Sequence, residues 1–326
     1  MSTGSRLKYY RRIFSAYLTP QMSHLTFWHE VPEVNNHFRA GELDEYYMAF
    51  TTKADYPGQY DGGGIPLLNY HGALGLQYNP IAVAQYGLGN YNIFRRTNES
   101  ERRRMFLTAA DWLVDNLELN PAGLWVWNHH FDWEYRTPLR APWYSGLAQG
   151  QGISLLVRAQ RETGKVAYLD AAQRAMQSFL KTVDEGGVIY VDGCGHTWFE
   201  EYIVFPPTHI LNGFIWASWG VYDYFLATGE SFALNLFNQA VRTLVTNLQH
   251  YDVGYWSLYE LSGNRLRMFA SPFYHRLQIV QLRVMHKLTR EPAFSEFAQR
   301  WERYEGDPIK RSRAVIQKAL FKILYY

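Results

Sequence analysis

The sequence predicts a mainly α-helical fold, an incomplete (α/α) toroid of four helical hairpins with a small N-terminal β-hairpin layer. Four short turns that begin with threonine recur about every sixty residues, and each separates an apolar helix from an amphipathic one. A long loop that contains a glycine and a short apolar run follows three of the hairpins. The turns are Thr97-Asn98-Glu99, Thr163-Gly164-Lys165, Thr228-Gly229-Glu230 and Thr289-Arg290-Glu291.

The composition is that of a globular protein with a sizeable core. Of 326 residues, 47% are hydrophobic and 17% aromatic, and the net charge of +2 gives no indication of nucleic-acid binding. The single cysteine, Cys194, excludes an internal disulfide framework. Residues 1–17 lack the apolar region of a signal peptide, and no apolar run reaches the length of a membrane span. We therefore expect a cytoplasmic protein.

The N-terminal part differs from the rest of the chain. Residues 5–17 fit a short amphipathic helix that ends near Thr19-Pro20. Residues 24–75 alternate short aromatic or branched runs, such as Tyr46–Phe50 and Ile65–Tyr70, with glycine- and proline-rich turns. This pattern predicts a β-rich hairpin region over 1–75 and a helical barrel domain over 76–326.

The helices on the two sides of each turn have different patterns. We expect the apolar ones over 79–89, 146–162, 209–227 and 274–288, and the amphipathic ones over 99–118, 166–182, 230–249 and 291–304. Because the two helices of a hairpin are antiparallel, the long loops that join successive hairpins all lie at one end of the toroid. Functional residues concentrate on loops held by a rigid scaffold, so we expect the site at that end.

Glu200-Glu201-Tyr202 lies in an aromatic, proline-bounded loop of this kind. Burial would raise the pKa of such a carboxyl and suit it to proton transfer, although a solvated surface turn fits the same residues. Glu134 or Glu260 could be a second carboxylate of a glycosidase. The side chains expected at the loop-bearing end are Glu201, Tyr202, Tyr259, Tyr274 and His275, with Tyr78, Tyr144, Gln149, Gln151, Asn212 and Arg276 behind them.

Other candidate motifs have weaker support from the sequence. The segment Gln149–Gly152 fits either a close approach of a ligand to the backbone or tight helix packing. The adjacent histidines His129 and His130 point in different directions and lack spaced partners, so they do not predict a metal site. An isolated tyrosine is more often a hydrogen-bonded core residue than an acid.

Several blocks, in one order between Tyr46 and Tyr304, resemble the D-glucuronyl C5-epimerase family. They include Gly75–Leu88, Trp143–Gln151, Glu200–Tyr202, Leu211–Phe214, Gly220–Asp223 and Tyr274–Leu282. The resemblance implies an N-terminal β hairpin, a C-terminal (α/α) barrel, and inversion of C5 of D-glucuronate to L-iduronate in a heparosan-like polymer. This reaction requires no cofactor. A calcium ion in the β region is possible by analogy, but the acidic residues there also fit solvated turns.

The resemblance also assigns roles to residues. Glu201 matches the family's catalytic glutamate, and Tyr202, Tyr259 and Tyr274 match its tyrosines. Glu201 and Tyr274 would act on opposite faces of the sugar, while Tyr259 and Tyr202 would hydrogen-bond the substrate carboxylate. We expect substrate contacts from Tyr78, Tyr144, Gln149, Asn212, His275 and Arg276.

The chain departs from the family pattern in three places. Residues 89–98 replace a β domain of the animal enzymes, and Ile203 stands where proline is frequent. Ser262 occupies the place of an arginine that would neutralise the substrate carboxylate, and the substitutes we expect for it are Arg265, Arg267 or Arg276.

Three other functions fit the same sequence. A polysaccharide lyase shares the first proton removal, a glycoside hydrolase would use two carboxylates, and a carbohydrate-binding protein would use only the aromatic residues. The expected partner in each case is a polysaccharide, acidic for the epimerase and the lyase. The apolar C-terminal run from Ala319 to Tyr326 must pack on the body or on a second copy in a homodimer.

Overall fold

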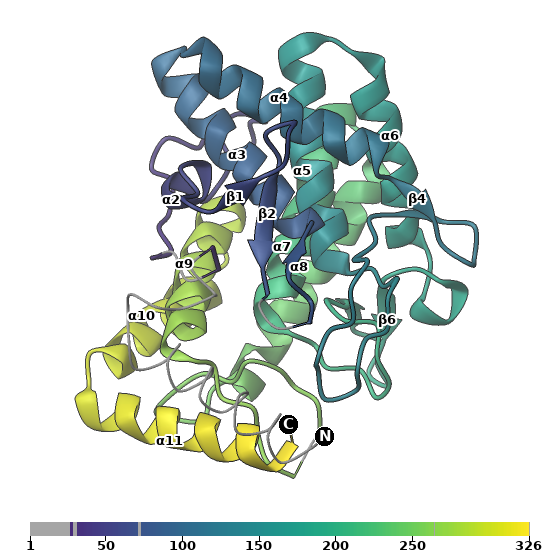
Figure 1. Ribbon diagram of the computed structural model, residues 1–326. Helices are drawn as coiled ribbons and strands as arrows, with labels where there is room; N and C mark the ends of the chain where they lie inside the picture. The colour runs from purple at the N-terminus through teal and green to yellow at the C-terminus, as the bar shows by residue number, and fades with distance from the viewer. Residues whose placement is uncertain (1–26, 29–30, 71–72, 264, 326) are drawn as a thin grey trace.

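The computed structural model describes residues 27–28, 31–70, 73–263 and 265–325 (Figure 1). The helix predicted over residues 5–17 lies outside these ranges. In the described part of the chain, no helix has the combination of length and apolar character that a membrane crossing requires.

Four antiparallel helical hairpins form the body of the protein, as the sequence predicts. The predicted helix over 79–89 extends further, to Thr97. Gly89 does not end it but allows close packing on Phe50, since a Cβ atom there would lie 2.4 Å from the carbonyl oxygen of Phe50. The hairpins are α3 (Pro80–Thr97) with α4 (Ser100–Asp115), α5 (Gly146–Thr163) with α6 (Val166–Met176), α7 (Leu211–Thr228) with α8 (Ser231–Tyr251), and α9 (Pro272–Thr289) with α10 (Pro292–Glu305).

One hydrogen-bond pattern explains the repeated threonine in the four turns. At Thr163, the hydroxyl donates to the carbonyl oxygen of Ala159 one turn earlier and accepts from the backbone N–H of Lys165. Thr97, Thr228 and Thr289 make the equivalent pair of bonds. The residue after each threonine adopts the left-handed conformation that ends the helix.

The first helices of the hairpins line the inside of the toroid. Helices α3, α5, α7 and α9 pack against one another in chain order, and α4, α6, α8 and α10 lie outside them (Figure 1). Within the described residues α9 does not pack along α3, so the ring stays open. A Cβ atom on Gly220 would lie 2.1 Å from the carbonyl oxygen of Gly150, so these glycines permit the close contact of α5 and α7. Tight packing thus accounts for the glycines of Gln149–Gly152.

The N-terminal region contains less β-structure than predicted. A three-stranded antiparallel sheet has the order β1 (Gln59–Tyr60), β2 (Pro66–Asn69) and β3 (Leu76–Gln77), with Gln59 opposite Leu67 and Leu68 opposite Gln77. The strand expected at Tyr46–Phe50 is wrong: it is one bridge at Met48, followed by α2 (Thr51–Ala54). The backbone of residues 33–35 pairs with one edge of this segment. At the other edge the Asn92 side chain accepts from the backbone N–H of Tyr46 and donates to the carbonyl oxygen of Met48.

The long loops lie together at the end of the toroid opposite the four turns (Figure 1). Short hairpins and 3₁₀ turns give these loops their shape. They are β4 (Glu118–Leu119) with β5 (Trp125–Val126), the 3₁₀ helices η1 (Gln177–Leu180) and η2 (Val183–Glu185), and β6 (Ile189–Val191) with β7 (Thr197–Phe199). The C-terminal helix α11 (Pro308–Tyr325) crosses this end, where Phe321 is buried against the loop residues Ile210 and Tyr259.

Candidate active site

Glu200 and Glu201 follow the β6–β7 hairpin and are held against the start of α5. The backbone N–H of Glu200 donates to Val188, and its carbonyl oxygen accepts from the backbone N–H of Gly146, with an N···O distance of 2.8 Å. A Cβ atom at Gly146 would lie 2.7 Å from that carbonyl oxygen, so glycine is required there. The two glutamates are therefore fixed at the loop-bearing end, as predicted, but their side chains have different surroundings.

Glu200 is a structural residue. Its carboxylate contacts the His209 ring at 2.5 Å through Nδ1, and accepts from the backbone N–H groups of His209 and Thr208 at 3.1 and 3.4 Å. The ring of His209 stacks on Trp198 with 4.3 Å between centroids, and the Tyr251 hydroxyl donates to the His209 carbonyl oxygen. These contacts hold the loop between β7 and α7 in one conformation.

Glu201, by contrast, is buried with few partners. Its side chain is 4% exposed, the Asn212 amide donates to it over 3.4 Å, and the hydroxyl of Tyr202 hydrogen-bonds it. Burial raises the pKa of Glu201 to about 8; the bond from Tyr202 lowers it, while the charges of Glu260 and Glu200 raise it further. Phe205, in the same aromatic loop, does not contribute to this burial, because it is 84% exposed.

Gly213, in the first turn of α7, provides the space that the Glu201 carboxylate occupies. A Cβ atom at this position would lie 2.2 Å from Oε2 and 2.7 Å from Cβ of Glu201. Any other residue at position 213 would therefore displace the carboxylate. The Leu211-Asn212-Gly213 helix start thus supplies both a hydrogen-bond donor and room for this group.

The predicted tyrosines gather around Glu201. The ring of Tyr259 lies edge-on to that of Tyr274, with 4.8 Å between centroids, and the ring of Tyr202 lies 4.7 Å from that of Tyr135. Burial raises the pKa of Tyr259, and the nearby charges of Glu201 and the other tyrosines raise it further. The structure therefore brings the four predicted catalytic residues into one cluster.

Glu260 and Tyr135 complete this cluster. The Tyr135 hydroxyl donates a short hydrogen bond to Oε2 of Glu260, while the buried Oε1 atom has no hydrogen-bond partner among the described residues. The sequence indicates Glu260 only as a possible glycosidase carboxylate and does not indicate Tyr135. Glu134, the neighbour of Tyr135 and the other candidate carboxylate, is exposed. No sequence signal pairs residues 135 and 260.

Some of the residues predicted to contact substrate lie near Glu201, and others are used in holding the fold together. Asn212 touches Glu201, as described above. Gln149 is buried, and its amide is used by Trp127, Trp125, Ala175 and Ser178. Such a fully used side chain holds α5 to its neighbours and has no capacity left for a ligand.

His275 and Arg276 point away from Tyr274. His275 is buried between Ser257 and the carbonyl oxygen of Trp301, and burial lowers its pKa to about 4, so it is a neutral core residue. Arg276 pairs with Glu305 of α10 at 2.7 Å. The expectation that these two side chains bind substrate does not agree with these contacts. Arg265 and Arg267 are exposed.

Tyr144 and Tyr78 lie at the loop-bearing end, away from Glu201. The Tyr144 hydroxyl donates to the carbonyl oxygen of Gly186, and the exposed Tyr78 donates to Asp61 at 2.8 Å. Within the described ranges, neither tyrosine has a hydrogen bond or a ring contact with a residue of the Glu201 cluster. They remain predicted substrate contacts at a distance from the reacting group.

The acidic residues of the β region are engaged by protein groups. Asp44 and Glu45 pair with Arg95 and Arg96, and Asp61 accepts from the backbone N–H groups of Gly63 and Ile65. Asp61 thus forms a turn, as one of the two interpretations of the sequence has it, whereas the ion pairs of Asp44 and Glu45 differ from the solvated turn expected there.

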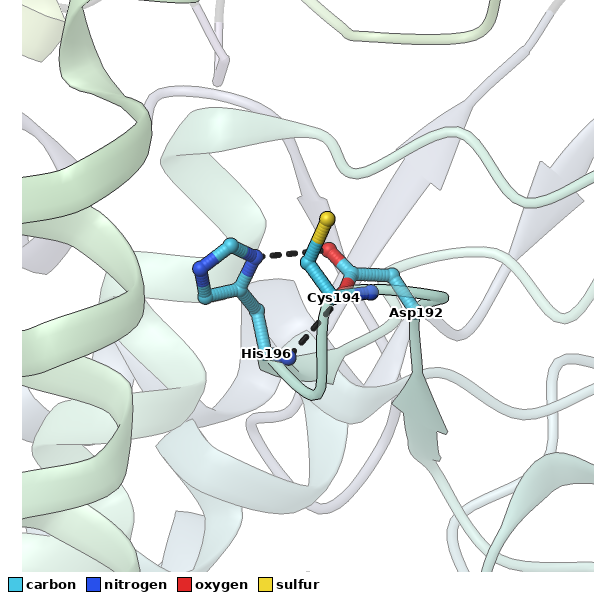
Figure 2. Close-up of side chains that lie close together, drawn as sticks. All are labelled: Asp192, Cys194 and His196. Atoms are coloured by element: carbon cyan, nitrogen blue, oxygen red, sulfur yellow. Dashed lines mark hydrogen bonds and ion pairs between the residues drawn. The ribbon is translucent and has the colours of Figure 1, made fainter.

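Asp192, Cys194 and His196 form a second cluster, in the turn between β6 and β7 (Figure 2). Asp192 accepts from the backbone N–H groups of Cys194 and His196, from the His196 ring and from the indole N–H of Trp198. Although burial opposes it, these bonds lower the pKa of Asp192 to about 2. Both carboxylate oxygens are thus used in shaping the hairpin that carries Glu200 and Glu201.

Comparison with known proteins identifies the family. Residues 120–303 match the model of the D-glucuronyl C5-epimerase C-terminus. The chain is 32% identical to the D-glucuronyl C5-epimerase of Caenorhabditis elegans over 215 residues, which are 61% of this chain and 34% of that protein. It is 27% identical to an uncharacterized protein of Methanocaldococcus jannaschii over 220 residues, 64% of this chain and 69% of that one. The match thus spans about a third of the nematode enzyme.

Solved structures are similar at lower identity. The unsaturated glucuronyl hydrolase of Bacillus sp. GL1 aligns with a TM-score of 0.45 and 14% identity, over 68% of this chain and 60% of that one. The cellobiose 2-epimerase of Spirochaeta thermophila aligns with a TM-score of 0.48 and 13% identity, over 68% and 57%. The family model matches more than half of the residues, and on that match the chain belongs to the D-glucuronyl C5-epimerase family.

Proposed function

We propose that this protein inverts C5 of D-glucuronate residues in a heparosan-like polysaccharide and gives L-iduronate. The observation that carries the proposal is the buried carboxyl of Glu201, which lies in one cluster with Tyr202, Tyr259 and Tyr274. Family membership supports the reaction type, and the named nematode relative is a D-glucuronyl C5-epimerase.

The reaction begins with removal of the C5 proton, which the adjacent carboxylate group makes more acidic. The C5–H bond lies α to the carboxylate, so removal of the proton moves the electron pair into the carboxylate and forms a dianionic enolate. Return of a proton to the opposite face of C5 restores the C–H bond with inverted configuration. One group must accept a proton and another must donate one, and the exchange requires no oxidant, reductant or cofactor.

Glu201 and Tyr274 are the pair that we assign to the two faces of the sugar. A pKa of about 8 places Glu201 close to neutrality, where both its protonation states are accessible and proton transfer is efficient. The Tyr202 and Tyr259 hydroxyls are suited to donate hydrogen bonds to the carboxylate as its negative charge increases. Burial keeps Tyr259 protonated, which is the state in which it can donate.

Exchange in heavy water tests the proposal. The protein is incubated with glucuronate polymers that differ in N-substitution, and NMR follows deuterium at C5 and the appearance of iduronate. Tyr274→Phe should abolish exchange while the circular dichroism spectrum and melting temperature stay close to wild type. Activity of this variant near that of the wild type would remove Tyr274 from the mechanism.

The same experiment separates the alternative functions. A lyase would also remove the C5 proton, but it would release a UV-absorbing unsaturated uronate through C4–O cleavage. A hydrolase would release reducing ends without C5 deuterium, as the two carboxyl groups Glu201 and Glu260 would permit. Binding of polymer without any of these products would indicate a carbohydrate-binding protein and contradict the epimerase proposal.

A further inference from the structure

Lys318 lies on the face of α11 that packs on the loop-bearing end. Ala314, Lys318 and Phe321 are spaced by four and three residues, so they share one side of the helix, and all three are buried. Phe321 belongs to the same apolar cluster as Tyr135 and Tyr259. Figure 1 shows α11 crossing the end of the toroid at which α9 begins. Among the described residues of α11, Lys318 is the one basic residue that is fully buried, and it lies against the tyrosine cluster.

The ammonium of Lys318 lies beside the candidate active site. Its Nζ atom is 4.9 Å from the centroid of the Tyr259 ring, and that ring is 4.8 Å from the ring of Tyr274. The charges that act on it are those of Glu260 and Lys322. Glu260 in turn acts on Glu201. Lys318 is thus linked to Tyr274 through the ring of Tyr259, and to Glu201 through the charge of Glu260.

Within the described residues, Lys318 has neither a hydrogen bond nor an ion pair, although it is only 5% exposed. Two other buried cations of the described residues are paired: Arg158 forms an ion pair with Asp223 at 2.7 Å, and the Lys53 ammonium donates to the carbonyl oxygen of Phe27 at 2.6 Å. A buried ammonium that faces an aromatic ring but has no hydrogen bond or ion pair costs free energy, which a bound anion would recover.

The burial of Lys318 also disfavours its charged form. Burial lowers the pKa of Lys318, and the nearby charge of Lys322 lowers it further, while Glu260 raises it. A negative charge placed against the ammonium would stabilise its charged form. The C5 reaction supplies such a charge, because the substrate carboxylate is anionic and becomes more so in the enolate.

We propose that Lys318 binds the carboxylate of the uronate and stabilises the enolate, so that α11 forms part of the active site. This inference rests on the proposed C5 epimerisation. The helix lies beyond residues 120–303, which match the family model. Lys318 would thus supply the positive charge missing at Ser262. Arg276 is paired with Glu305, and Arg265 and Arg267 are exposed, so these three expected substitutes are less suitable.

The test compares Lys318→Met with Lys318→Arg and with a matched control, Arg311→Met. Methionine retains the length of the side chain and removes its charge, while Arg311 is an exposed cation on the same helix. We expect Lys318→Met to lower kcat/KM for C5 exchange about 10²-fold, as removal of one charge-stabilising donor does elsewhere. Its melting temperature should stay equal or rise. Lys318→Arg should restore part of the activity, and Arg311→Met should stay within about twofold of wild type, as expected for an exposed charge that is screened by solvent.

Each other outcome has a defined meaning. Exchange by Lys318→Met within about threefold of wild type overturns the inference, given that a lost donor costs about 10²-fold. So does a variant that loses stability and activity together, with both restored by arginine, because that pattern indicates a structural role. Arg136, which has one buried guanidinium nitrogen without a partner among the described residues, is the alternative cation. Loss of exchange in Arg136→Met but not in Lys318→Met would assign the role to Arg136.

Failure of the proposed function would look different. In that case the wild type would show no exchange with any uronate polymer. Calorimetric binding of a glucuronate oligosaccharide would then still test Lys318 as an anion-binding residue. Binding at least tenfold weaker in Lys318→Met than in Arg311→Met would support the contact, and equal binding would refute it.

Discussion

The difference between two adjacent glutamates, Glu200 and Glu201, predicts opposite effects of the same substitution. Glu201 is buried and its pKa is raised, so its charged form is unfavourable in the folded protein. Glu200 is anchored by His209 and two backbone N–H groups. Glu201→Gln should therefore stabilise the protein at alkaline pH, whereas Glu200→Gln should destabilise it.

The magnitude follows from proton linkage. The pKa of Glu201 rises from an ordinary 4.5 to about 8, a difference of 8 − 4.5, or about 3.5 units. At 1.36 kcal/mol per unit this corresponds to an upper limit of about 5 kcal/mol for the loss of unfolding free energy between pH 4 and pH 9. The unfolding free energy decreases with rising pH because the folded state binds the Glu201 proton more tightly than the unfolded state does. Stability is therefore greatest below pH 4.5 and falls as pH rises through 8.

The assay is urea denaturation of wild type and both variants at pH 4.5, 6, 7.5 and 9. We expect Glu201→Gln to match wild type at pH 4.5 and to exceed it by about 2–4 kcal/mol at pH 9. Glu200→Gln, the matched control, should lose about 1–3 kcal/mol through its weakened bonds to His209 and the backbone. A difference between Glu201→Gln and wild type that does not change with pH would refute the raised pKa.

Two further substitutions test how the site is built. Gly213→Ala should lower C5 exchange at least 10²-fold while the protein remains folded, because its Cβ would lie 2.2 Å from the Glu201 carboxylate; activity near wild type would contradict this geometry. His275→Phe should lower the unfolding free energy by about 2–4 kcal/mol and leave KM within about twofold, since it removes the bonds to Ser257 and Trp301; a large rise in KM with normal stability would restore His275 as a substrate contact.

The hairpins could be predicted from the sequence because their signals are local. A threonine hydroxyl that bonds to a carbonyl one turn earlier and to the N–H two residues later requires only neighbouring residues. The strand expected at Tyr46–Phe50 is reduced to one bridge with Val34, because a side chain takes the other edge of its backbone. Asn92 bonds to that edge from 46 residues further along the chain, and aromatic content alone does not distinguish this contact from a sheet.

The site could be predicted at the level of segments, and less well at the level of side chains. Consecutive residues of a helix point about 100° apart, so Tyr274, His275 and Arg276 cannot all face one substrate. The structure directs Tyr274 to Tyr259, His275 to the core and Arg276 to α10. A helix start rich in polar aromatic residues therefore indicates where a site is, while the packing of neighbouring helices decides which residue belongs to it.

Packing also decides the position of Lys318, which the sequence does not indicate as a site residue. Nothing in the sequence of α11 distinguishes this lysine from the half-buried Lys310 or the exposed Arg311, because its burial depends on how α11 crosses the loops. Evolution could have placed methionine there at lower cost in folding free energy. A lysine kept beside Tyr259 without an ion pair in the described structure is explained if an anionic substrate completes its environment. The stability and the activity of Lys318→Met should therefore change in opposite directions.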